Sequence, residues 1–244
     1  MNDECNIFAV HFISMYPLIL HIETSTELCS VALSHGNNCL AVRENSEGRN
    51  HAAMLTPFID DLLNESNISI HQLDAIAVSS GPGSYTGLRI GLSTAKGLCY
   101  GGNIPLMAVS TLHAMSLGFV EQHDVLPSTL LCPMIDARRM EVYTALYDRD
   151  GRQMKQISAE IITEQSFIQW LDAYPVIFFG NGAAKCRNMI THPNAVFPED
   201  FAHSARYMIQ PALQAYSEKR FEDTAYLEPF YLKDFIAGPK KKVN

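Results

Sequence analysis

Positive charge and long apolar runs are both scarce in this sequence of 244 residues. Its 18 Lys and Arg residues stand against 26 Asp and Glu residues, which gives a formal net charge of -8. Because nucleic-acid phosphates are bound by clustered Lys and Arg, this balance argues against tight nucleic-acid binding by the chain alone. The basic run at 240–242 is expected to be a solvated tail. No stretch of about 18 apolar residues occurs, so we expect no membrane-spanning helix.

Patterns typical of metal and disulfide sites are also absent. The six cysteines form no Cys-x-x-Cys pair, and the nine histidines include no pair three or four residues apart. This spacing favours buried, reduced thiols in a cytoplasmic protein over disulfides or zinc, and it predicts no metal site. Because 47% of the residues are hydrophobic, the chain is expected to be globular, with one or two domains.

The stretch Gly81–Arg89 is the most distinctive feature that the sequence does contain. It reads Gly-Pro-Gly-Ser-Tyr-Thr-Gly-Leu-Arg and lies between an apolar, β-branched run at 73–79 and a helical pattern at 88–100. The pattern predicts a strand, a glycine turn and a helix that opens at Ser84 or Thr86, which are both suitable N-cap residues. Free N–H groups and the helix dipole at such a turn favour an anion. The stretch is neither a Walker loop nor Gly-x-Gly-x-x-Gly, so a structural turn and a phosphate or carboxylate site both stay open.

The helix after this turn carries a ridge with almost no side chain. Gly87, Gly91 and Ala95 are spaced four residues apart and therefore lie on one face. Each glycine costs the helix about 1 kcal/mol relative to alanine, so we expect a compensating contact. The close neighbour is either an internal helix or sheet of this chain, or a helix from a partner chain.

The order of the elements indicates two similar halves. In the first half we expect strands at 18–24, 29–34, 39–44, 73–79 and 105–109, and helices at 51–66, 84–101 and 110–120. In the second half we expect strands at 129–136, 141–147, 153–162 and 175–179, and helices at 163–174 and 204–217. The aromatic tail at 226–232 is expected to pack back on the body. These elements predict a duplicated α/β fold with a cleft between an N-terminal domain at 17–122 and a C-terminal domain at 123–244. Residues 1–16 form an extension, and Met15 is an alternative start.

This order and several motifs resemble the actin/Hsp70/sugar-kinase (ASKHA) superfamily and, more closely, the TsaB (YeaZ-like) family, formerly grouped with glycoproteases. The resemblance covers residues 18–233. It is carried by Ile-Leu-His-Ile-Glu-Thr-Ser at 19–25, the glycine stretch at 81–89 and Pro-Met-Ile-Asp-Ala-Arg at 133–138, with shorter matches at 29–33, 51–59, 109–112, 141–143 and 228–232. It implies a duplicated actin-like fold made of two β-β-β-α-β-α domains.

The resemblance also implies a non-catalytic role. Proteins of this family bind and activate the catalytic paralogue TsaD, which transfers a threonylcarbamoyl group to N6 of adenosine 37 in tRNA, and the ATPase TsaE joins them. It implies a homodimer in isolation, contact with tRNA only through the complex, and no cofactor of its own, while ATP or ADP at the complex interface stays open. The implied interface is on the helices at 51–66 and 84–101. Its expected residues are His51, Leu55, Gly83, Ser84, Thr86, Gly87, Arg89, Gly91 and Ala95.

An enzyme of the same superfamily is the alternative. Glu23 and Asp136 each end the first strand of their half, where carboxylates of nucleotide-binding relatives hold Mg²⁺ or orient water. They either form a vestigial or working nucleotide cleft with Thr24, Gly180 and Gly182, or are the charged ends of inherited strands.

A glycoprotease-like hydrolase is a third possibility, but it needs paired metal histidines, and His51 has no partner within one turn. We expect His51 to be a hydrogen-bond donor at the helix start or an interface residue. For Arg89, an internal salt bridge and a ligand contact are both open.

Overall fold

The computed structural model describes residues 16–46 and 50–232. The expectations for Met15, for the extension before Tyr16 and for the lysines at 240–242 lie outside the described residues. No helix within the described ranges is long and apolar enough to cross a bilayer.

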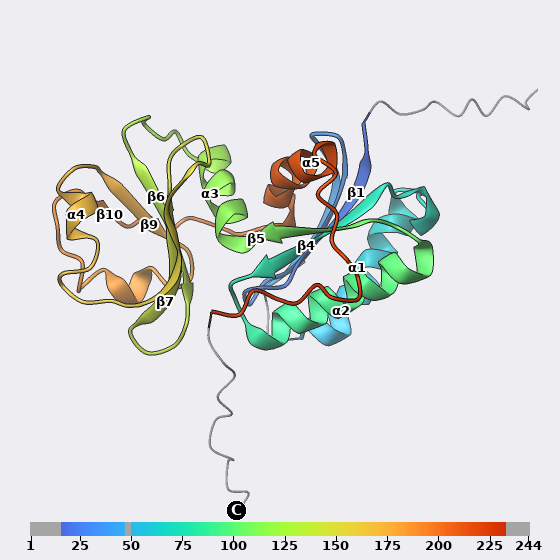
Figure 1. Ribbon diagram of the computed structural model, residues 1–244, viewed down its shortest axis with the longest axis horizontal. Helices are drawn as coiled ribbons and strands as arrows, with labels where there is room; N and C mark the ends of the chain where they lie inside the picture. Colours follow the sequence, from blue (N-terminus) through green and yellow to red (C-terminus); the bar gives the residue numbers. More distant parts are fainter. Residues whose placement is uncertain (1–15, 47–49, 233–244) are drawn as a thin grey trace, which may run out of the picture.

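Two five-stranded sheets form the body of the molecule (Figure 1). In the first, the order is β3-β2-β1-β4-β5, and its strands are β1 (Leu18–Glu23), β2 (Cys29–His35), β3 (Asn38–Asn45), β4 (Ala75–Gly81) and β5 (Leu106–Ser110). In the second, the order is β8-β7-β6-β9-β10, and its strands are β6 (Leu130–Asp136), β7 (Glu141–Tyr147), β8 (Gln153–Ile161), β9 (Val176–Phe179) and β10 (Ala195–Val196). In each sheet the first three strands in this order pair antiparallel with one another, and the last two strands join them in parallel. The predicted duplicated actin-like fold is confirmed.

One face of the first sheet is covered by α1 (His51–Glu65) and α2 (Tyr85–Gly102) (Figure 1). Both helices pack into one apolar cluster with the alternate residues Leu20, Ile22 and Val31 of β1 and β2. Leu55, Ile59 and Leu62 of α1 and Leu92 and Ala95 of α2 lie in that cluster, as helical spacing predicts. The α1 helix continues through Pro57.

Two helices are exchanged between the halves. The helix that follows β5, α3 (Thr111–Gln122), packs on β6 and β7 of the second sheet through Leu112, Met115 and Phe119. The short 3₁₀ turn η3 (Ala205–Met208) and α5 (Ile209–Ser217) return to the uncovered face of the first sheet. That face carries the small residues Ala75 and Ala77, so α5 can approach it closely. The expected domain boundary after residue 122 stays a prediction, and helix packing crosses it in both directions.

The second half contains less helix than its sequence pattern predicts. Only Ile168–Leu171 (α4) is α-helical within the expected helix at 163–174. Phe167 has a left-handed φ of 63° and a buried ring, so core packing interrupts the helix there. The remaining elements are the 3₁₀ turns η1 (Ile70–Gln72) and η2 (Ala184–Cys186).

The tail after α5 packs back on the first half, as predicted. Glu222 N–H donates to the Leu106 carbonyl oxygen (2.8 Å), and Phe230 N–H donates to the Ser80 carbonyl oxygen (2.7 Å). Leu227 packs against the cluster beneath α1 and α2. The tail therefore crosses the edge of the sheet and passes along α2 (Figure 1).

A buried histidine in β1 should make the stability of this fold depend on pH. His21 is fully buried, its Nε2 lies 2.8 Å from the Ser34 hydroxyl, and burial lowers its pKa from 6.5 to about 3. Between those two pH values the unfolded chain binds more protons, so the free energy of unfolding should fall as pH falls, with a slope of up to about 1.4 kcal/mol per pH unit from this group. Urea unfolding of the wild type and of His21→Met from pH 7.5 to pH 4 measures the free energy of unfolding of each protein. The difference between the two free energies should shrink toward low pH. Parallel curves would contradict this assignment.

Candidate functional site

The glycine turn at 81–83 is built against the connection between β1 and β2. Gly81 has a φ of 110°, and a Cβ on Gly83 would overlap the Ser25 backbone. Ser84 N–H donates to the Ser25 carbonyl oxygen (2.6 Å), and the Ser84 hydroxyl accepts from Gly87 N–H (3.3 Å). Ser84 is therefore the N-cap of α2, one of the two residues predicted for it. The geometry of the turn is explained by this internal contact.

The glycine ridge of α2 faces the same connection. A Cβ on Gly87 would overlap the Thr24 carbonyl oxygen, and one on Gly91 would overlap the Thr24 hydroxyl. That hydroxyl donates to the Gly87 carbonyl oxygen (2.8 Å), and Ala95 is fully buried in the core. Of the two neighbours left open by the sequence, the internal one fills the ridge. The expectation that Gly87, Gly91 and Ala95 receive a partner helix is wrong, because their own chain already occupies that face.

The other residues expected at the interface divide by exposure. Leu55 is 1% exposed and belongs to the core. His51 is 6% exposed, and its Nε2 bonds the Leu28 carbonyl oxygen (3.1 Å), as expected of a donor at a helix start. Gly83 is half-buried, whereas Ser84, Thr86 and Arg89 are exposed.

Arg89 is held by aromatic side chains. Its Nε donates to the Tyr231 hydroxyl (3.0 Å), and its guanidinium lies 4.0 Å from the Tyr85 ring centroid. The Tyr85 and Tyr231 rings are 4.9 Å apart. Of the two contacts left open by the sequence, the internal salt bridge does not form within the described residues, where Arg89 makes cation–π and hydroxyl contacts instead.

Glu23 lies fully buried at the end of β1. Its Oε1 accepts from Ser25 N–H (2.6 Å), and its Oε2 lies 3.0 Å from Nε2 of His203, an ion-pair distance without hydrogen-bond alignment. Burial alone would raise the pKa of Glu23, but the nearby His203 and the hydrogen bond from Ser25 bring it below its ordinary value. Its carboxylate therefore lies against a residue of the segment that leads into η3.

Asp136 lies half-exposed at the end of β6 and pairs with Lys185. Its Oδ1 contacts the Lys185 ammonium and accepts from Arg138 N–H (2.8 Å). Burial would raise the pKa of Asp136, but Lys185 and the Arg138 N–H lower it overall. Lys185 also donates to the Glu141 carbonyl oxygen (2.7 Å).

The glycine loop after β9 packs tightly on this strand end. A Cβ on Gly182 would lie 2.9 Å from the Ile135 carbonyl carbon, and Gly180 has a φ of 98° against Met134. Asn181 Oδ1 accepts from Asp136 N–H (3.0 Å). The residues expected in a nucleotide cleft are thus brought into two local groups, Glu23 with Thr24 and Asp136 with Gly180 and Gly182.

Sequence reasoning missed His203 and Lys185. Both are single charged residues in irregular segments and belong to no motif, so only the return of η3 and the position of η2 reveal their partners. Among the described residues, no three His, Cys, Asp or Glu side chains are grouped to hold a metal ion.

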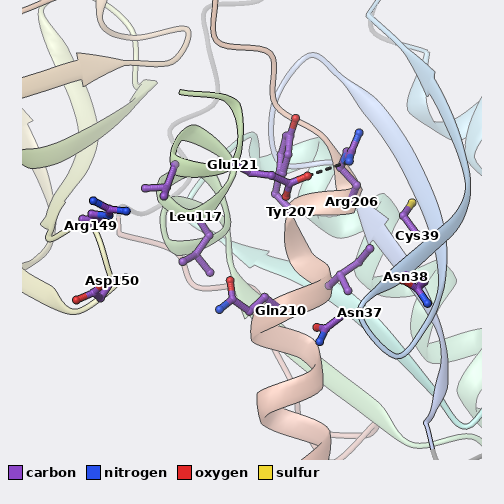
Figure 2. A pocket seen from close by; sticks show the side chains of 12 residues that line it. Asn37, Asn38, Cys39, Leu117, Glu121, Arg149, Asp150, Arg206, Tyr207 and Gln210 are labelled. Atoms are coloured by element: carbon purple, nitrogen blue, oxygen red, sulfur yellow. Dashed lines mark hydrogen bonds and ion pairs between the residues drawn. The ribbon is translucent and has the colours of Figure 1, made fainter. Parts of the chain in front are cut away.

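A groove of about 800 Å³ lies away from the predicted residues, between α3, the η3–α5 segment and the turns at 37–39 and 149–150. Figure 2 shows Glu121 and Arg206 paired across one end (2.8 Å), with Arg149 and Asp150 on the far side of α3. None of the predicted site residues lines it.

The two sides of α2 should respond oppositely to a methyl group. Gly87→Ala should lower the free energy of unfolding by about 1–3 kcal/mol, because the Thr24 backbone cannot move away cheaply. Gly97→Ala meets no atom within 4 Å and should raise it by up to about 1 kcal/mol through helix propensity. Denaturant unfolding of the wild type and both variants at one pH measures these changes in the free energy of unfolding. Equal effects would contradict the assigned orientation of the helix.

Comparisons with known proteins place these features in a family. The family model described as TsaD, tRNA N6-adenosine threonylcarbamoyltransferase, matches residues 43–226. The tRNA threonylcarbamoyladenosine biosynthesis protein TsaB of Haemophilus influenzae is 30% identical over 91% of this chain and 96% of its own length. Its Escherichia coli counterpart is 32% identical over 91% of this chain and 97% of its own length.

Solved structures agree with these matches. A Pseudomonas aeruginosa protein described as similar to peptidase YEAZ superposes with a TM-score of 0.77 and 29% identity, covering 89% of this chain and all of its own. A second structure, YeaZ from the same species, gives a TM-score of 0.77 at 28% identity. With a shared fold, near-complete coverage and these identities, the chain belongs to the TsaB (YeaZ) family.

Proposed function

We propose that this chain is a non-catalytic accessory subunit that binds and activates TsaD in N6-threonylcarbamoylation of adenosine 37 of tRNA. Its relatives are named as tRNA threonylcarbamoyladenosine biosynthesis proteins, and the matching family model is named for the transferase itself. In this proposal tRNA and TsaE meet the chain only within the complex. A homodimer uses the same surface when TsaD is absent.

The observation that carries the non-catalytic role is the internal pairing of both strand-end carboxylates. Glu23 is fully buried against His203, and Asp136 pairs with Lys185 while accepting from Arg138 N–H. A carboxylate that handles Mg²⁺ or orients water needs free oxygen atoms directed at a ligand. Here both oxygens of Glu23 and Oδ1 of Asp136 already make internal contacts at the ends of β1 and β6.

The partner surface in this proposal is the outer side of α2 together with the neighbouring side of α1. Thr86, Ser93, Gly97 and Gly101 are exposed on α2, and no atom lies within 4 Å of a Cβ added to either of these glycines. Small residues let another helix approach closely. Tyr100, 88% exposed, supplies a large aromatic group of the kind enriched in protein interfaces.

Gly97→Leu should block the partner without disturbing the monomer. The leucine side chain would extend into open space in the monomer but would hold a packed helix away. We expect the affinity for TsaD from the same organism to fall at least about tenfold, a loss of about 1.4 kcal/mol. Light scattering after size-exclusion chromatography, and threonylcarbamoylation of tRNA with and without the chain, measure pairing and activation.

Asn188→Leu, at an exposed position of the second half, is the matched control and should pair normally. Normal pairing by Gly97→Leu would show that the outer side of α2 is not the interface. Absence of both complex and stimulation with the wild-type chain would overturn the accessory role.

The nucleotide-hydrolase alternative requires Asp136 and Glu23 as catalytic groups. We expect any ATP turnover by the purified chain to be unchanged in Asp136→Asn, because Lys185 already neutralises that carboxylate. Glu23→Gln should instead lower the melting temperature, because it leaves His203 without its buried counter-charge. A phosphate-release assay measures the ATP turnover, and thermal unfolding measures the melting temperature. Loss of ATP turnover in folded Asp136→Asn protein would favour the hydrolase.

A further inference from the structure

Two consecutive arginines form an unusual turn between β6 and β7. Arg138 has a φ of 72° and Arg139 a φ of 50°, which places both in the left-handed region. Non-glycine residues are uncommon there, and hairpin turns of this kind favour Asn and Gly. Both arginines are exposed.

The other left-handed residues in the described chain have local explanations. Asn103 caps the end of α2, and Asn67 and Lys219 follow the ends of α1 and α5, where this conformation is common. Phe167 has its ring buried in the core. Arg138 and Arg139 neither end a helix nor bury a side chain. Within the described chain their guanidinium groups make no hydrogen bond or ion pair, so nothing there compensates for the strain.

The turn is nevertheless fixed in place. Arg138 N–H donates to Asp136 Oδ1 (2.8 Å), Glu141 N–H donates to the Arg138 carbonyl oxygen (3.1 Å), and Ala137 N–H donates to the Glu141 carbonyl oxygen (3.1 Å). Lys185 contacts Oδ1 of the same Asp136 carboxylate, and the Arg138 guanidinium acts on that carboxylate through its charge, without a hydrogen bond or ion pair within the described chain. The protein thus fixes the backbone of this turn, while both arginine side chains are exposed.

The internal duplication allows this turn to be compared with its counterpart in the first half. In the first half, the equivalent connection between β1 and β2 is covered by α2, which presses on Thr24 and Ser25. In the second half, the element after the corresponding strand β9 is the three-residue turn η2 (Ala184–Cys186). Within residues 16–46 and 50–232, the connection between β6 and β7 therefore has no covering helix like that of its counterpart.

We propose that the Arg138–Arg139 turn binds carboxylate groups on the surface of the protein partner. This inference rests on the proposed function and names a second contact in the same complex. Guanidinium groups form paired hydrogen bonds with carboxylates, and arginine is enriched in protein interfaces. RNA is less suited, because two cations on a chain of net charge -8 fall short of the clustered Lys and Arg that phosphate backbones require.

The experiment combines Arg138→Asn and Arg139→Gly in the full chain. These residues suit the backbone, so the melting temperature should stay the same or rise by about 2–4 °C. The dissociation constant for TsaD should rise about tenfold or more and depend less steeply on salt. Titration calorimetry at two salt concentrations measures both. Arg152→Asn, which removes another exposed arginine that has no side-chain partner in the described chain, is the control and should bind as the wild type does.

The outcomes separate this inference from the accessory role. A folded double variant that binds TsaD within twofold of the wild type overturns the arginine contact while the accessory role stands. An unchanged dissociation constant with a raised KM for tRNA also overturns it, in favour of an RNA contact. If the wild-type chain does not bind TsaD at all, the arginine contact fails together with the accessory role.

Discussion

The close approach of α2 to the β1–β2 connection is the contact on which the first half depends. Glycines at 83, 87 and 91 remove the side chains that would otherwise separate them, so Thr24 and Ser25 bond directly to the helix backbone. This contact fixes the N-cap at Ser84 and sets the direction of the helix. The glycine cost is thus offset inside the monomer, and among the described residues the opposite side of α2 is exposed at Ser93, Gly97 and Gly101.

The exchange of α3 and α5 is the second constraint, and it creates the buried Glu23–His203 pair. The segment that returns to the first sheet carries His203 to the end of β1, and Ala205 N–H then bonds the Ser30 hydroxyl (2.8 Å). Removing one member of a buried pair strands the other charge, so both residues are tied to this packing. The exchange therefore joins the two halves and also covers the Glu23 carboxylate with His203.

The positions of β1 to β9, the Ser84 cap, the duplicated order and the packing of the tail can be predicted from sequence patterns, whereas the two-residue strand β10 is too short for periodicity to reveal. The partner of the glycine ridge cannot. Periodicity identifies which residues share a face of a helix, but not what covers that face. The contacts of Glu23 and Asp136 are equally hidden, since His203 and Lys185 come from irregular segments. The shortened helix at 168–171 reflects core packing of Phe167, which overrides helix propensity.

The two halves share their strand order but differ in the element after the fourth strand. After β4 comes an 18-residue helix that buries the first connection, whereas after β9 comes a three-residue turn that leaves the second connection open. The strand-end carboxylates differ in the same way, one fully buried and the other half-exposed beneath a strained arginine turn. A cleft that bound a nucleotide symmetrically between two halves would need both ends free. Here one end is closed by internal packing and the other presents cations outward, an arrangement that suits a surface that binds another protein.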